Sequence, residues 1–259
     1  MMSLFKKSKI LVMGDIMLDK YLFGEANRMS PEAPVPVFDI KEEINKPGGA
    51  ANVAVNLSSL GQEVTLFSIC ASDANGKILL GLINAQNNIY YKIPQKRSAF
   101  KTITKTRIMC QNQQLMRIDN EKGFRSGMSE NFIWRNIVNP ARRSDAIIIS
   151  DYNKGLIDHW TPDLIKDAIK NKIPVFVDPK NDNYNLYRGA TCITPNLKEF
   201  TRIMTKMTGY DQDYLTSGII CEYELKSIEK DCRELISKYK FRSILVTLGK
   251  HGMLLVEKN

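Results

Sequence analysis

The fold of this chain is decided by the stretch Lys46-Pro47-Gly48-Gly49-Ala50-Ala51-Asn52-Val53-Ala54-Val55-Asn56-Leu57. Apolar residues recur at Val53, Leu57 and Leu60, which predicts a helix that begins at the glycines and stops at Gly61. Glycine lets another group approach the main chain closely, and a helix start presents unpaired N–H groups, so a small polar ligand would fit here. The alternative is a helix packed tightly against a sheet through its small alanine side chains. The stretch alone leaves both interpretations open.

Strand-like and helix-like segments alternate on both sides of this stretch. Short apolar runs typical of buried strands cover residues 9–15, 63–69, 145–151, 173–178, 192–196 and 243–249. Helical periodicity follows Asp73 and covers residues 129–141 and 222–239, and Thr161-Pro162-Asp163 is a strong helix start. Such alternation predicts an α/β protein with a doubly wound, mainly parallel sheet and helices on both faces.

Two segments break this alternation. Three prolines keep residues 27–37 extended, and residues 90–119 contain half-polar strand patterns, notably Lys101-Thr102-Ile103-Thr104-Lys105-Thr106-Arg107-Ile108. Strands of this kind cover something on one face only. We therefore expect a small β-flap, built from about 16–45 and 90–119, beside the main sheet.

Polar side chains end several of the predicted strands. They are Asp15, Asp151, Asp178 with Lys180, Asn196, and Thr247 with Gly249. Because parallel strands share one carboxyl edge, these residues should line one crevice, where ligands of open α/β sheets bind. Any single one could instead cap its own turn, but the coincidence at five strands favours a site.

The composition excludes several classes of protein. The net charge is +9, yet the basic residues are scattered, which argues against a nucleic-acid surface and leaves anionic small molecules as partners. No apolar run approaches the roughly 20 residues of a membrane helix, so no membrane partner is expected. The five cysteines have no C-x-x-C spacing, which favours a reducing cytoplasm over a disulfide framework or zinc site. Neither a P-loop nor a G-x-S-x-G elbow is present.

Several motifs resemble the ribokinase-like (PfkB-type) carbohydrate kinases. They are Gly14-Asp15-Ile16-Met17-Leu18-Asp19, Pro47-Gly48-Gly49-Ala50-Ala51-Asn52-Val53-Ala54, Asp178-Pro179-Lys180, Thr194-Pro195-Asn196-Leu197-Lys198-Glu199-Phe200 and Val246-Thr247-Leu248-Gly249. Three further stretches, residues 30–37, 112–119 and 150–155, are similar to the heptose 7-phosphate kinase domains of bacterial bifunctional heptose kinase/adenylyltransferases. The resemblance runs from about residue 9 to the end and implies a ribokinase-like sheet with a β-lid, which commonly forms a homodimer.

The resemblance also implies an activity. It is phosphate transfer from ATP, with Mg²⁺, to the 1-hydroxyl of D-glycero-β-D-manno-heptose 7-phosphate, which feeds lipopolysaccharide core synthesis in the cytoplasm. The implied sugar contacts are Asp15, Gly48, Gly49 and Asn52, with Asn112, Gln113 and Asp119 from the lid. Candidates for the 7-phosphate are Arg28, Lys105, Arg107 and Lys154, since guanidinium and ammonium groups bind phosphate.

The implied nucleotide contacts lie in the second half of the chain. Asn196 and Glu199 match an Asn-x-x-Glu motif that orders Mg²⁺ through water, flanked by Leu197 and Lys198. Lys180 is expected at the ATP phosphates, and Thr247 and Gly249 at the nucleotide.

One departure from the family pattern affects catalysis. The family's Asp-x-x-Gly-Ala-Gly-Asp signature supplies the catalytic base, and these 259 residues contain no Gly-Ala-Gly-Asp. We therefore assign no catalytic residue and expect the base beyond Asn259, with residues 1–259 forming an incomplete kinase domain and the adenylyltransferase domain absent. Two alternatives are a fragment of a longer kinase and an inactive sugar-phosphate-binding remnant.

Overall fold

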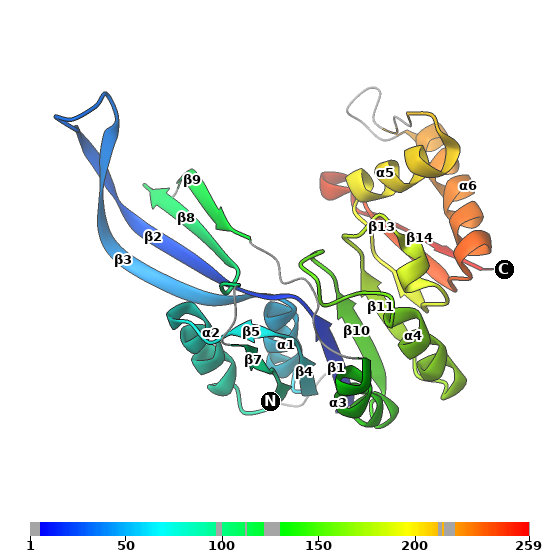
Figure 1. Ribbon diagram of the computed structural model, residues 1–259. Helices are drawn as coiled ribbons and strands as arrows, with labels where there is room; N and C mark the ends of the chain where they lie inside the picture. The colour runs from blue at the N-terminus through cyan, green and yellow to red at the C-terminus, as the bar shows by residue number, and fades with distance from the viewer. Residues whose placement is uncertain are drawn as a thin grey trace.

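The computed structural model describes residues 6–96, 100–111, 113–121, 130–211, 214 and 221–258. Its centre is an eight-stranded sheet with the order β14-β13-β12-β11-β10-β1-β4-β6 (Figure 1). Every neighbouring pair is parallel except β13 and β14. The strands are β1 (Lys9–Gly14), β4 (Glu63–Phe67), β6 (Ile89–Lys92), β10 (Ala146–Ser150), β11 (Val175–Asp178), β12 (Cys192–Ile193), β13 (Ser243–Thr247) and β14 (Met253–Glu257). The predicted doubly wound, mainly parallel sheet is confirmed.

Helices cover both faces of this sheet because its central strands are apolar on both sides. Val12 of β1 packs with the helices α1 (Ala50–Ser59) and α2 (Ala74–Asn84), whereas its neighbours Leu11 and Met13 belong to a second, larger core cluster. The other helices are α3 (Glu130–Arg142), α4 (Thr161–Lys170), α5 (Leu197–Thr208) and α6 (Glu222–Tyr239), with short 3-10 turns η1 (Tyr184–Tyr187) and η2 (Gly249–His251). A two-residue pair, β5 (Cys70–Ala71) with β7 (Gln95–Lys96), completes the described elements.

A second sheet projects from the carboxyl edge of the first, and we call it the small sheet. Its strand order is β3-β2-β8-β9, with β2 (Ile16–Met29), β3 (Pro36–Gly49), β8 (Thr104–Cys110) and β9 (Gln113–Asn120). In Figure 1 it extends to the upper left, well away from α5 and α6.

The small sheet differs from the predicted flap at both of its boundaries. The strand β3 continues beyond residue 45 to Gly49, and residues 89–92 form β6, which pairs with β4 in the large sheet. Ile89 is buried beside α2, whereas Tyr90 and Tyr91 are exposed at the edge of that sheet. An edge strand and a flap strand both have one polar face, so the pattern of residues 89–92 did not distinguish them.

None of the helices in the described ranges is both long enough and apolar enough to span a membrane.

Candidate active site

The carboxyl ends of the parallel strands bring the predicted polar residues to one edge. The backbone N–H of Asp15 donates to the Ser150 carbonyl at 3.3 Å, and that of Asp151 donates to the Asp178 carbonyl at 3.1 Å. An isolated bridge joins Asn196 to Thr247 further along the same edge. The strand-end residues therefore line a continuous edge, as the sequence predicted.

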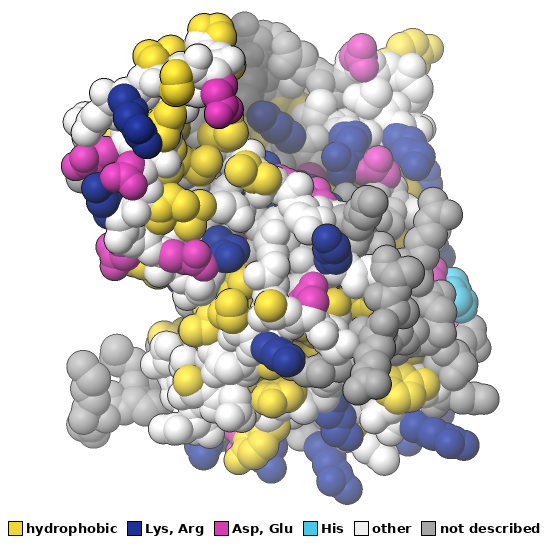
Figure 2. Space-filling view, turned by 60° about the vertical axis from the view of Figure 1, so that its left-hand side comes forward, with side chains coloured by type: hydrophobic (Ala, Val, Ile, Leu, Met, Phe, Trp, Pro, Cys, Tyr) yellow, Lys and Arg dark blue, Asp and Glu magenta, His cyan; other side chains and the backbone are white. Residues whose placement is uncertain are grey.

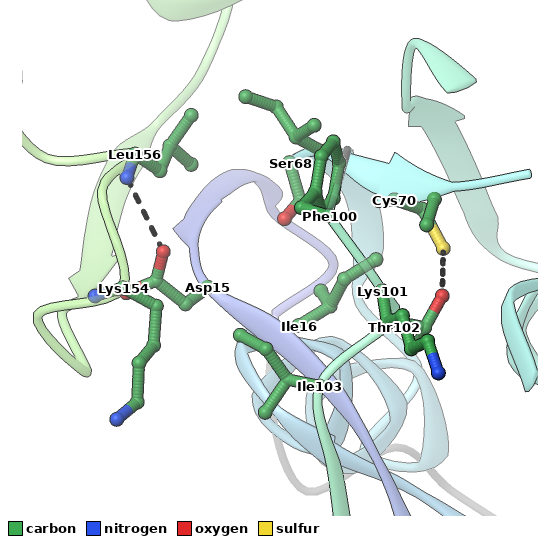
Figure 3. Close-up of a pocket in the computed structure, with 12 residues that line it drawn as sticks. Asp15, Ile16, Ser68, Cys70, Phe100, Lys101, Thr102, Ile103, Lys154 and Leu156 are labelled. Carbon is green, nitrogen blue, oxygen red and sulfur yellow. Dashed lines mark hydrogen bonds between the residues drawn. The ribbon is translucent and has the colours of Figure 1, made fainter. Parts of the chain in front are cut away.

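Asp15 organises the loop that follows β10. Its carboxylate is 5% exposed and accepts hydrogen bonds from the backbone N–H groups of Tyr152 (3.0 Å), Lys154 (3.0 Å) and Leu156 (3.3 Å). Figure 3 shows Asp15 facing this loop. Burial raises the pKa of the carboxyl, although the three backbone donors oppose that rise. A carboxylate offers about four acceptor positions, so roughly one remains for a ligand hydroxyl.

The two glycines that precede α1 serve the packing of the chain itself. A Cβ on Gly49, whose φ is +60°, would lie 2.3 Å from the Asp15 carbonyl oxygen, and one on Gly48 would lie 2.3 Å from an Asp19 carboxylate oxygen. The alanines of the first turn of α1 are fully buried. The packing interpretation of this stretch is therefore confirmed. Binding of a ligand here stays a prediction that rests on Asn52, which is exposed in the same turn.

Three of the four basic candidates gather near the base of the small sheet, each beside an acid. The Arg107 guanidinium lies 2.7 Å from Asp19 and over the Tyr21 ring, 5.0 Å from its centroid. The ammonium groups of Lys105 and Lys154 lie 2.8 and 2.7 Å from the two oxygens of Glu121.

The other small-sheet candidates are not brought to this place. Arg28 is exposed at the outer end of β2, opposite Val37, and Gln113 is exposed beside Cys110 at the outer end of the β8–β9 hairpin. Asp119 lies at the inner end, opposite Lys105 and 3.7 Å from its ammonium group. Asn112 falls outside the described residues.

The Asn-x-x-Glu motif forms a capping box at the start of α5. The Asn196 side chain accepts from the Glu199 N–H, and Glu199 accepts from the Asn196 N–H, both at 3.0 Å. The other Glu199 oxygen lies 2.8 Å from the Lys180 ammonium group, and Glu199 is 7% exposed. The motif thus has a structural role, whatever it binds.

The neighbouring nucleotide candidates present different surfaces. Lys198 is exposed, whereas Leu197 is partly buried and packs against the core. Thr247 ends β13 and donates its N–H to the Pro195 carbonyl at 3.0 Å. Gly249, with φ +61°, opens onto free space.

Two acids between these groups have strongly shifted pKa values. Burial raises the pKa of Asp151 to about 6, although a hydrogen bond from the Tyr187 hydroxyl opposes this. Asp178 is exposed, yet desolvation by the surrounding protein and then the carboxylates of Glu199 and Asp151 raise its pKa to about 6. A cation nearby would relieve this repulsion. In the described part of the chain no three His, Cys, Asp or Glu side chains are arranged to hold a metal ion directly.

A small pocket opens beside Asp15, as Figure 3 shows. One wall is the 100–103 segment, which Asp73 holds by accepting from the N–H and hydroxyl of Thr102 at 2.9 and 2.6 Å. Lys154 and Leu156 form the opposite wall. The pocket thus joins the Asp15 loop to the base of the small sheet.

Sequence reasoning missed two acids in this region, Asp19 and Glu121, as site residues. Asp19 follows Asp15 at a spacing of four, and Glu121 follows Asp119 at a spacing of two, but neither spacing indicates a partner. Both acids pair with cations that are distant in the sequence.

Comparison with known proteins defines the class. A model of the pfkB family of carbohydrate kinases matches residues 7–259, and the chain belongs to this family. Its fold is similar to that of Escherichia coli phosphofructokinase-2 in complex with fructose-6-phosphate, with a TM-score of 0.68 at 18% identity over 98% of this chain and 77% of that one. A microbiome-derived acarbose kinase, Mak1, is similar to the same degree, with a TM-score of 0.68 at 14% identity, covering 98% of this chain and 74% of that one.

More similar in sequence are curated proteins named "Bifunctional protein HldE". One from Coxiella burnetii (strain Dugway 5J108-111) is 38% identical over 257 residues, which is 99% of this chain and 50% of the relative. One from Actinobacillus succinogenes (strain ATCC 55618 / DSM 22257 / CCUG 43843 / 130Z) is 37% identical over 255 residues, 98% of this chain and 50% of the relative. The chain therefore spans about half the length of these relatives.

Proposed function

We propose that this carbohydrate kinase domain transfers the γ-phosphoryl group of ATP to the 1-hydroxyl of D-glycero-β-D-manno-heptose 7-phosphate. The observation that carries this proposal is the 38% identity with an HldE protein over 257 residues, which includes both the small sheet and the strand-end site. The motifs at 30–37, 112–119 and 150–155, which resemble heptose kinases in particular, lie in or next to the small sheet and the Asp15 loop.

On the acceptor side, the sugar would lie over the start of α1. The Asn52 side chain is exposed there, and among the described residues nothing bonds it, so it is free to contact a sugar hydroxyl. Asp15 would accept from a second hydroxyl with its remaining acceptor position. The 7-phosphate would bind Lys105 and Lys154, the two ammonium groups that meet at the mouth of this region, with Arg107 nearby.

On the nucleotide side, the phosphates of ATP would meet Lys180 and the start of α5. The Glu199 carboxylate would hold Mg²⁺ through water, because both of its oxygens already accept a protein hydrogen bond. Bound Mg²⁺ would neutralise charge on the triphosphate during transfer. The rest of the nucleotide would be bordered by Thr247, Gly249, Leu197 and Lys198. Gly249 would contact it through its open surface, and Leu197 through its backbone.

We further propose that the protein works in the cytoplasm as a homodimer in which two small sheets meet. The small sheet carries exposed apolar side chains at Leu115, Met116 and Ile118 of β9, and at Met29 of β2 and Ile40 of β3. Figure 2 shows hydrophobic side chains gathered on the projecting upper-left lobe. A second copy would cover this surface. An Ile118→Asp variant should then shift the protein to monomer in size-exclusion chromatography with light scattering.

A second candidate function is sugar-phosphate binding without turnover. It is favoured by one observation: the residues proposed to hold the sugar phosphate, Asp15, Lys105 and Lys154, lie together near the base of the small sheet, and binding alone needs no catalytic base.

One pair of measurements separates the two functions. Calorimetry should detect binding of heptose 7-phosphate in preference to unphosphorylated heptose and fructose 6-phosphate, and Asn52→Ala should weaken that binding. The exposed Asn56, one turn further along α1, gives the matched control Asn56→Ala. ADP release in the presence of ATP and Mg²⁺ would then support the kinase. Binding without ADP release would support the second candidate, and equal binding of all sugars would contradict both.

A further inference from the structure

The carboxylate of Glu121 lies between two ammonium groups that come from different sheets. Glu121 directly follows β9 of the small sheet, and Lys105 belongs to β8 of the same sheet. Lys154 belongs to the loop after β10 of the large sheet, and its own backbone N–H is held by Asp15. The Glu121 oxygens accept from Lys105 at 2.8 Å and from Lys154 at 2.7 Å.

This carboxylate is fully ionised at neutral pH. The hydrogen bonds from Lys105 and then Lys154 lower its pKa to about 2. The three side chains are only 17%, 19% and 32% exposed for Lys105, Lys154 and Glu121, so water screens the contacts in part only. Asp119, at 3.7 Å from Lys105, is the second acid that faces the group, and it is bonded by Arg117 at 2.9 Å.

All three basic residues near the base of the small sheet are already paired with an acid, so a phosphate that binds there must compete with a carboxylate. Arg107 is paired with Asp19, and Lys105 and Lys154 share Glu121. Two ammonium groups that each bond one oxygen of a carboxylate can bond two oxygens of a phosphate in the same way. A phosphate dianion carries more negative charge than the Glu121 carboxylate and can replace it at the two lysines. A neutral sugar has no anionic group that could do so.

We propose that Glu121 is an internal competitor of the phosphate group: its carboxylate occupies Lys105 and Lys154 until the phosphate group of the sugar displaces it. The inference rests on the proposed sugar-phosphate function and deepens it. Unphosphorylated sugars leave the three-residue contact intact and gain nothing from the two lysines. Sugar phosphates exchange with Glu121, and the exchange also releases the inner end of β9 from the loop that Asp15 holds.

The test compares Glu121→Gln with Glu43→Gln, a control that removes an ion-paired carboxylate of the same small sheet, which pairs with Lys20 at 3.0 Å instead of with Lys105 and Lys154. Isothermal titration calorimetry would measure binding of heptose 7-phosphate, fructose 6-phosphate, inorganic phosphate and unphosphorylated heptose to the full chain. Removing the competing carboxylate should tighten heptose 7-phosphate binding about fivefold in Glu121→Gln and leave unphosphorylated heptose unchanged. Glu43→Gln should change both by less than about twofold.

The other possible outcomes also support or overturn the inference. Weaker or unchanged binding of every phosphate to Glu121→Gln would overturn the inference, as would a gain that persists in the double variant Glu121→Gln/Lys154→Gln. Should Glu121→Gln fail to fold, Glu121→Asp, which keeps the charge on a shorter side chain, should tighten heptose 7-phosphate binding by a smaller factor, and no gain would overturn the inference. A gain for fructose 6-phosphate and inorganic phosphate without any preference for heptose 7-phosphate would uphold the exchange and refute the proposed substrate.

Discussion

Two lysine–glutamate contacts lie along the carboxyl edge of the large sheet, and they differ in how they are built. Glu199 is buried and also caps α5, so its pairing with Lys180 is part of a helix terminus. Glu121 is partly exposed and bonds two ammonium groups from two sheets. The first pair is a fixed structural element, whereas the second is a contact that can be exchanged. The difference indicates where the molecule is rigid and where it responds to a ligand.

The largest effect on stability is expected at Gly49, where β3 of the small sheet ends and α1 begins. A Gly49→Ala variant forces a Cβ to 2.3 Å from the Asp15 carbonyl at a φ of +60°. We expect a loss of about 3 kcal/mol in the free energy of unfolding, measured by urea denaturation.

The matched control for this change is Gly81→Ala in α2, where a Cβ would meet nothing within 4 Å. It should stabilise the protein by about 0.5–1 kcal/mol, because alanine favours the helix. Equal effects of the two variants would show that the close approach at Gly49 is not maintained in solution.

The next effect concerns the fixed pair. Glu199→Ala removes the capping box and leaves the Asn196 N–H without its acceptor, so we expect a loss of about 2 kcal/mol in the free energy of unfolding. Glu199→Gln retains the acceptor and should lose less than about 1 kcal/mol. If the two substitutions cost the same, charge rather than capping would be the dominant contribution, and the contrast with Glu121 would weaken.

A third effect concerns the pH dependence of stability and the buried acid Asp151, which lies on the same edge of the large sheet. Burial raises the pKa of Asp151 from 3.8 to about 6, so the folded state binds more protons than the unfolded state between these pH values. The free energy of unfolding should therefore fall as the pH rises from about 4 to about 6, by about 1–2 kcal/mol through this group.

Asp151→Asn should remove that part of the pH dependence, which urea denaturation at several pH values would measure. The control is Asp163→Asn, which removes a carboxylate from the exposed surface instead of a buried one. An unaltered profile in Asp151→Asn would contradict the buried-acid interpretation.

The smallest effect is expected at the exchangeable pair. Glu121→Ala should lower the free energy of unfolding by only about 0.5 kcal/mol, since the contact is partly exposed, and added salt should reduce even this difference. A loss as large as that of Glu199→Ala would show that both pairs are structural, and the comparison would fail.

The sequence predicted the parts of this molecule that depend on local order. Apolar runs placed the parallel strands, Asp73 was recognised as the cap of α2, and residues 222–239 form α6 as expected. The Asn-x-x-Glu spacing is local as well, because a capping box needs residues three apart. Asp19 and Glu121 could not be found in this way, since their partners Arg107 and Lys154 lie 88 and 33 residues away. Arg107 meets Asp19 only when β2 and β8 pair, and Lys154 meets Glu121 only when both sheets are in place.

The connections between the small sheet and the elements of the large sheet are very short. Only Asp15 separates β1 from β2, and no residue separates β3 from α1, because β3 ends at Gly49 and α1 begins at Ala50. The small sheet therefore cannot move independently of the large one. A rotation of the small sheet would also move the first turn of α1 and the Asp15 carboxylate. Hydrogen exchange at the Ala50, Ala51 and Asn52 amides should thus report on a ligand bound anywhere beneath the small sheet.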